Sequence, residues 1–355
     1  MTLARTAIKA AVVPGLERVA LLLLLCGAAL GPHGLAILTP STLSLLDPAV
    51  PVGLAVFGII AAMRVPATRR STPIAAALQA AVTGLVVAGA LIVARPALSF
   101  LDLFPPWDLA AVVIGIAAAT SAPLAWRAGE SSETARPFSA DDAFLPIVAG
   151  GVVLALQREA NLTTALQFAA QVAGIAAVIA ACGWLMLVRA STLEERRVGI
   201  VACVLLLGGA ADYLSMSALL CGVVAGTCWR LAGAAVREHI RRDVTYVADS
   251  LLALLLVLAG AHADYSPAAL TLAIAYTVLR ASGKLAGAWM TRRLFPASTP
   301  PPARLLLAPG AFGVAFALNV VRVLGDAFAV VLTVVVVGTI ASSVIAAVAD
   351  PGEDA

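Results

Sequence analysis

Apolar stretches long enough to cross a lipid bilayer follow one another along almost the whole chain, and this feature constrains the fold most. A membrane-spanning helix needs roughly 20 mainly apolar residues. Only 12% of the residues are charged, whereas a soluble domain carries about twice that fraction. We therefore predict an all-α polytopic membrane protein of about twelve transmembrane helices. Their approximate limits are 14–37, 48–64, 73–94, 107–126, 138–157, 163–188, 198–211, 214–229, 244–262, 267–290, 303–322 and 326–349.

The distribution of lysine and arginine supports this set of helices. When the N-terminus is placed in the cytoplasm, only Arg95 and Arg158 of the 23 Lys and Arg residues fall in outer loops. Three others lie within spans, namely Arg280, Lys284 and Arg322, and the rest fall in inner segments. This bias follows the positive-inside rule. We predict a multi-pass protein of the bacterial plasma membrane with both termini in the cytoplasm.

Two of the predicted helices, the fourth and the eleventh, contain residues that break helices. Proline removes a backbone donor and glycine loosens the helix. Broken helices at matching positions of two inverted repeats are typical of transporter binding sites. The breakers are Thr120, Ser121 and Pro123 in the fourth helix, and Pro309 and Gly310 in the eleventh.

The positions of these breaks predict how the chain is organised. Each break falls in the fourth helix of a five-helix unit, so helices 1–5 and 8–12 are predicted to form inverted-topology repeats with two broken crossing helices. We predict a single transmembrane domain over residues 1–355. Its parts are a first repeat (14–157), linking helices (158–211), a second repeat (212–349) and a short acidic tail (350–355).

An aspartate pair and a lysine lie within apolar segments. Asp141 and Asp142 open the fifth predicted span, and Lys284 lies in the tenth. Ionisable groups at membrane depth are usually functional, and two adjacent acids need a cation, a proton or a basic partner. The residues therefore predict a proton-coupled cation site. Two structural alternatives are that the acids cap the start of a helix and that the lysine extends to the cytosol.

Several segments then carry a family resemblance, in order, over about residues 20–349. They are GAALGPHGLAILTPSTLSLL, AAATSAPLAWRAGE, SADDAFLPIV, YLSMSALLCGVVAG, LLALLLVLAGAHAD, RASGKLAGAWM and LLLAPGAFGVAFA. Together they resemble the bacterial monovalent cation:proton antiporter superfamily, which has the sodium/proton exchanger fold.

The resemblance implies roles for individual residues. Asp142 would alternately bind the cation and a proton, Asp141 would pair with Lys284, and Thr120 would lie near the ion. Paired acids with the lysine resemble the electrogenic exchangers. The implied function is exchange of Na⁺ or K⁺ for protons by a protein that is not an enzyme. It implies no cofactor, no metal beyond the transported cation and no nucleic-acid partner. We also predict a homodimer in the lipid bilayer.

Other features leave alternatives open. Arg280 shares a helical face with Lys284, and it is predicted to be a charge partner, paired with Asp141 or with a backbone carbonyl. Thr120 and Ser121 also have a structural alternative, which is to satisfy their own helix backbone. Arg322 is predicted to extend to the outer surface. Arg64 stands where the family usually has an acid. The alternative functions are a sodium-coupled organic-anion symporter and a non-transporting structural or sensory protein.

Overall fold

The computed structural model describes residues 19–64, 71–98, 106–120, 135–158, 161–231, 234–296, 307 and 310–348, and within these residues every regular element is a helix. The first apolar helix is Val19–Leu30. It is followed by α2 (Pro40–Leu46), α3 (Ala49–Arg64), α4 (Ser71–Val93), α5 (Arg95–Leu98), α6 (Trp107–Ala119), α7 (Ala135–Arg158), α8 (Leu162–Arg189), α9 (Leu193–Tyr213), α10 (Ala218–Arg230), α11 (Ala234–His262), α12 (Pro267–Leu294), α14 (Ala311–Leu324), the short 3₁₀ helix η3 (Asp326–Phe328) and α15 (Ala329–Val348).

Each of the twelve predicted segments contains a helix, which confirms the all-α fold class. In the described part of the chain, three helical segments are long and apolar enough to cross a membrane on their own: Ile74–Val93, Leu162–Arg189 and Asp326–Ile345. The pair α2 and α3, bent by 46°, is a fourth when it is counted as one span. Among the described residues, α6 and α14 belong to a set of shorter apolar helices of 10–17 residues.

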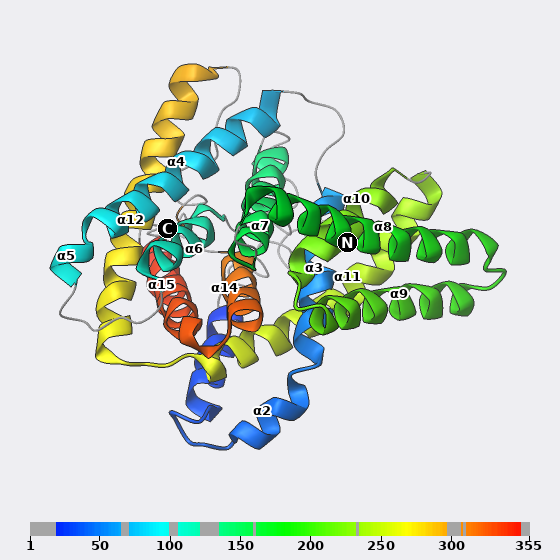
Figure 1. Cartoon of the computed structure of the whole chain (residues 1–355), viewed down its shortest axis with the longest axis horizontal. Coiled ribbons are helices and arrows are strands. Elements are labelled where there is room, and N and C mark those ends of the chain that lie inside the picture. Colours follow the sequence, from blue (N-terminus) through cyan, green and yellow to red (C-terminus); the bar gives the residue numbers. More distant parts are fainter. Residues whose placement is uncertain are drawn as a thin grey trace, which may run out of the picture.

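The helices pack as two groups, which lie on the left and the right of Figure 1. One group, the α4/α12 group, consists of α4, α6, α12, α14 and α15, and each of these helices contacts at least two others of the group. The other, the α3/α10 group, consists of α3, α8, α9, α10 and α11. Helix α7 contacts members of both groups, and α14 contacts α11, α3 and α10 across the boundary.

Small residues and two buried indoles hold the helices close together. A Cβ on Gly222 of α10 would collide with the carbonyl oxygen of Ala55 on α3, so only glycine permits this approach. The Trp229 indole donates to the Ala180 carbonyl over 2.9 Å, and the Trp107 indole donates to the Leu91 carbonyl over 3.0 Å. These two tryptophans lie near predicted span ends but are buried helix-to-helix contacts.

Several helix limits differ from the prediction. The first helix ends at Leu30 rather than near residue 37, because a turn begins at Gly31. Helix α9 continues through the two glycines at 208 and 209, and the break before α10 falls at Leu214–Ser217, where Ser215 has a positive φ of 50°.

The start of α9 shows a local cause of helix initiation. Thr192 and Glu195 form a capping box, in which each side chain accepts a hydrogen bond from the backbone N–H of the other residue. Hydrogen bonds from the Ser191 backbone and hydroxyl and from the Thr192 backbone lower the pKa of the Glu195 carboxyl below its usual value.

Candidate functional site

The candidate site lies where α6 ends in the interior of the molecule. Helix α6 stops at Ala119, and Thr120 has an extended backbone (φ −67°, ψ 136°). The helix therefore ends seven residues before the predicted limit of 126. This end lies inside the protein and not at its surface, because Thr120 is only 2% exposed. The last carbonyls of a helix have no partner within it and form the negative end of its dipole. The end of α6 is thus a buried place that attracts positive charge.

Arg280 of α12 supplies one positive charge at this end. Its guanidinium donates to the Thr120 carbonyl over 3.2 Å and to the Leu307 carbonyl over 2.7 Å. Leu307 lies shortly before α14. One buried side chain, 2% exposed, therefore connects the end of α6 with the segment that leads into α14. Of the two predicted partners for Arg280, the backbone carbonyl is confirmed.

Lys284 supplies a second positive charge, one turn further along α12. The side chain is fully buried, and its ammonium donates to the Ala119 carbonyl over 2.5 Å. The alternative that Lys284 extends to the cytosol is therefore wrong, because the ammonium points inward at the end of α6. The partial negative charge at the C-terminal end of α6 thus helps to stabilise both Arg280 and Lys284, which lie on the same buried face of α12.

The start of α14 packs against the same helix end. Gly310 is the extended residue that precedes α14 (φ −98°, ψ 152°). A Cβ on Gly313 would lie 2.9 Å from the Thr120 hydroxyl oxygen and 3.2 Å from the Ala117 carbonyl oxygen. The absence of a side chain at Gly313 thus lets the two interrupted helices meet.

The predicted acids lie on α7, but their side chains are outside the described residues. Helix α7 begins at Ala135, so Asp141 and Asp142 lie in its second turn rather than at its start. The alternative that they cap this helix is therefore wrong. Helix α7 contacts α4, α6 and α14, so it belongs to the same neighbourhood as the end of α6.

The other predicted site residues divide into two kinds. Thr120 is at the site, where its hydroxyl donates to the Ala117 carbonyl over 2.7 Å, as the structural alternative expected. Gly310 is at the second interruption. Ser121, Pro123 and Pro309 lie outside the described residues.

Sequence reasoning missed one buried polar group beside the site. Gln79 of α4 is fully buried, and neither its amide nitrogen nor its amide oxygen has a hydrogen-bond partner among the described residues. Its backbone carbonyl accepts from Thr83, and a Cβ on Gly287 of α12 would lie 3.0 Å from the same carbonyl oxygen. The signal in the sequence was a glutamine within an alanine-rich span. A buried amide usually has a hydrogen-bond partner, so its position could have marked Gln79 as a candidate site residue.

Within the described part of the chain, no group of three or more His, Cys, Asp or Glu side chains is placed to hold a metal ion. The positive groups and the helix-end carbonyls are the chemistry that the described site offers. Such carbonyls can bind a cation in place of an ammonium or guanidinium group.

Comparisons with known proteins agree with this architecture. No protein-family model matches the sequence, and no curated protein matches it either. Among solved structures, the chain is similar to the sodium proton antiporter MjNhaP1 from Methanocaldococcus jannaschii at pH 8. The TM-score is 0.65 at 17% sequence identity, and the match covers 99% of this chain and 97% of the other. The chain is a helical membrane protein with the fold of a sodium/proton antiporter.

Proposed function

We propose that the protein is a secondary active antiporter that exchanges a monovalent cation, Na⁺ or K⁺, for protons across a bacterial plasma membrane. One observation carries this proposal. Two buried cationic side chains, Arg280 and Lys284, donate to backbone carbonyls at the interrupted end of α6, within a fold that MjNhaP1 shares.

The mechanism that we propose is competition for one carboxylate. Asp142 binds either a partly dehydrated cation or a proton, and it cannot hold both at once. The interrupted helices supply carbonyl oxygens and dipole ends that complete the coordination of the cation. The packing of α7, which carries Asp142, against α6 and α14 supports this arrangement.

We further propose that exchange is electrogenic through Asp141 and Lys284. A buried ammonium keeps its charge beside a carboxylate and tends to lose it alone. Cation binding would draw Asp141 away, so that Lys284 releases an additional proton in each cycle. Replacing Lys284 with alanine should leave any remaining exchange insensitive to the membrane potential.

The test of the proposed function is proton movement in everted membrane vesicles. Adding NaCl or KCl should dissipate a preformed pH gradient in vesicles with the unmodified protein, and Asp142→Asn should abolish this response. Asp108→Asn is the matched control, because Asp108 is exposed and pairs with Arg95 over 3.5 Å at the surface. Wild-type exchange by Asp142→Asn would refute the role of this acid.

The same vesicles separate the alternative functions. A sodium gradient that loads an organic anion, with no proton movement, would identify a symporter in which Arg280 and Lys284 bind the carboxylate. A folded protein that moves neither ions nor solute would be a non-transporting member of the fold.

Two further parts of the proposal concern the protein in its membrane. We propose cytoplasmic termini, as the arginine distribution predicts, and a homodimer. Reporter fusions after residue 355 and in the loop near Asp264 should give opposite readouts. A reporter after residue 355 that reads as external would overturn the predicted orientation.

A further inference from the structure

A pocket of about 320 Å³, lined by both charged and apolar side chains, lies at the other end of α14 from the candidate site. Helix α14 begins beside Thr120 at Gly310 and ends at Leu324. Arg322, in its last turn, is nine residues beyond Gly313, which is about 13 Å along a helix. The pocket is therefore joined to the candidate site by one short helix, and it lies at the predicted outer end of the molecule.

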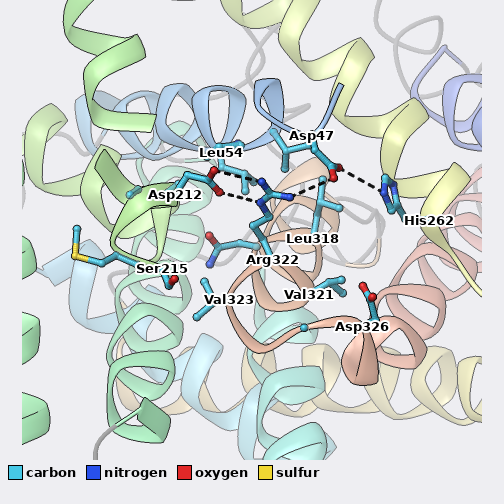
Figure 2. A pocket seen from close by; sticks show the side chains of 17 residues that line it. Asp47, Leu54, Asp212, Ser215, His262, Leu318, Val321, Arg322, Val323 and Asp326 are labelled. Carbon is cyan, nitrogen blue, oxygen red and sulfur yellow. Dashed lines mark hydrogen bonds and ion pairs between the residues drawn. The ribbon is translucent and has the colours of Figure 1, made fainter. Parts of the chain in front are cut away.

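Arg322 occupies the centre of this pocket and contacts two carboxylates from different elements (Figure 2). Its guanidinium donates to both oxygens of Asp212, over 3.0 and 3.3 Å, and lies 3.4 Å from an oxygen of Asp47. The other oxygen of Asp47 lies 3.7 Å from the His262 ring. Arg322 is 32% exposed, so its side chain does reach the surface, and there it is paired with these two carboxylates.

These ion pairs cross between the two helix groups. Arg322 belongs to α14 in the α4/α12 group, whereas Asp212 is in the last turn of α9 in the α3/α10 group. Asp47 caps the end of α2, two residues before α3 of that same group begins. His262 ends α11 in that same group. Any displacement of α14 relative to α3 and α9 must therefore lengthen or break the contacts of Arg322.

A second polar contact crosses the same boundary one turn deeper. The Asn319 amide of α14 donates to the Ser217 hydroxyl over 3.1 Å, and Ser217 is the residue that caps the start of α10. Asn319 is buried and lines the pocket, together with Leu318 and Leu54. The outer part of the pocket is thus lined by the ion pairs of Arg322. Its inner part, here called the floor, is formed by the buried residues Leu318 and Asn319 between the two groups.

We propose that Arg322, paired with Asp212 and Asp47, is the outer gate of the transport pathway. This inference rests on the proposed antiporter function, which requires the site to be exposed to one side at a time. When the pairs are formed, the two groups are held together at this end. When α14 moves, Arg322 leaves the carboxylates, and the floor of the pocket becomes open to the outside.

The ion pairs suit a gate because they are only partly buried. The side chains of Arg322, Asp47 and Asp212 are 32%, 32% and 37% exposed. Water can replace each lost partner, so separating the pairs costs little compared with separating a buried pair.

The experiment measures access to the pocket floor. Leu318, which is 4% exposed, is replaced with cysteine, and the rate of labelling by a membrane-impermeant cationic thiol reagent is followed from the outside. Labelling of the chain with only its 5 native cysteines is subtracted as background. Adding Arg322→Gln should raise the labelling rate roughly threefold to tenfold, as expected for the loss of weak ion pairs that favour one of two states.

Two further variants keep the result interpretable. Arg95→Gln breaks an exposed ion pair with Asp108 away from the pocket and should leave the labelling rate unchanged. Exchanging the charges, with Arg322→Asp and Asp212→Arg together, should return the rate toward that of the parent. Asp212→Asn serves as a second opening variant if Arg322→Gln does not yield folded protein.

The proposal is overturned if folded Arg322→Gln and Asp212→Asn label at the parent rate, or if Arg95→Gln labels equally fast. Labelling needs no ion gradient, so it is independent of the vesicle assay. If Arg322→Gln changes the labelling rate but the protein exchanges no ions, the antiporter function is refuted and the proposed movement of α14 still stands. If the protein exchanges ions but the labelling rate is unchanged, only the gate is refuted.

Discussion

Arg280 and Arg322 act at opposite ends of α14, and they bind different kinds of partner. Arg280 is buried and donates to two backbone carbonyls, of Thr120 and Leu307. Arg322 is about one third exposed and pairs with two carboxylates. The first connects interrupted helices within one helix group, and the second connects the two groups. A contact that must persist is buried among fixed backbone groups, whereas one that must break is left accessible to water.

The largest effect should come from removing the buried arginine. Arg280→Met removes charged donors from two buried carbonyls, and hydrogen bonds to charged groups contribute about 1.5–3 kcal/mol each, so a loss of about 3 kcal/mol or more is expected. The measurement is the midpoint of thermal unfolding in detergent. Arg293→Met on the same helix is the control, because Arg293 is exposed and lies 5.5 Å from the centre of the Trp289 ring. Equal midpoints for the two variants would contradict the structural importance of the Arg280 contacts.

An intermediate effect should come from filling the contact between the two interrupted helices. Gly313→Ala places a Cβ within 2.9 Å of the Thr120 hydroxyl oxygen, and overpacking of this kind costs about 1–3 kcal/mol. Gly89→Ala on α4 is the matched change, because a Cβ there meets nothing within 4 Å. That variant should be stabilised by about 0.5–1 kcal/mol through reduced backbone freedom. Thermal unfolding that moves in the same direction for both variants would show that the helix ends separate easily.

The smallest effect on stability should come from Arg322. Exposed ion pairs contribute at most about 1 kcal/mol each, and Arg322 forms two of them. Arg322→Gln should therefore lower the free energy of unfolding by no more than about 2 kcal/mol. Because salt screens exposed charges, the difference from the parent should shrink between roughly 0.05 M and 1 M choline chloride. The loss in Arg280→Met should be the same at both salt concentrations. A large loss of unfolding free energy in Arg322→Gln that persists at high salt would show that these ion pairs behave like the buried contacts of Arg280. That result would argue against a gate.

The elements of the fold were predictable because a membrane-spanning segment must contain a long apolar run, which the sequence shows directly. Each predicted segment contains a helix, and α6 ends before Thr120 while α14 begins after Gly310, two of the predicted break residues. The limits were less predictable. Helix α6 ends at Ala119 rather than near residue 126 because Thr120 leaves the helix and turns its hydroxyl back to the Ala117 carbonyl.

The candidate site was predictable in composition but only partly in contacts. Arg280, Lys284 and Thr120 stood out as polar residues in apolar spans, and the structure brings all three to the end of α6. Gln79 was missed because a single amide gives no periodic pattern. Asp141 and Asp142 remain predictions, since their side chains lie outside the described residues.

The sequence by itself determined that the chain is a helical membrane protein, roughly where its helices lie and which of them are interrupted. These properties depend on local composition and on one physical length, the thickness of the bilayer. Only the tertiary structure decided the partners of the charged side chains. Lys284 meets a carbonyl 165 residues away, and Arg322 meets a carboxylate 110 residues away. Contacts over such separations depend on how helices pack, which hydrophobic length does not encode.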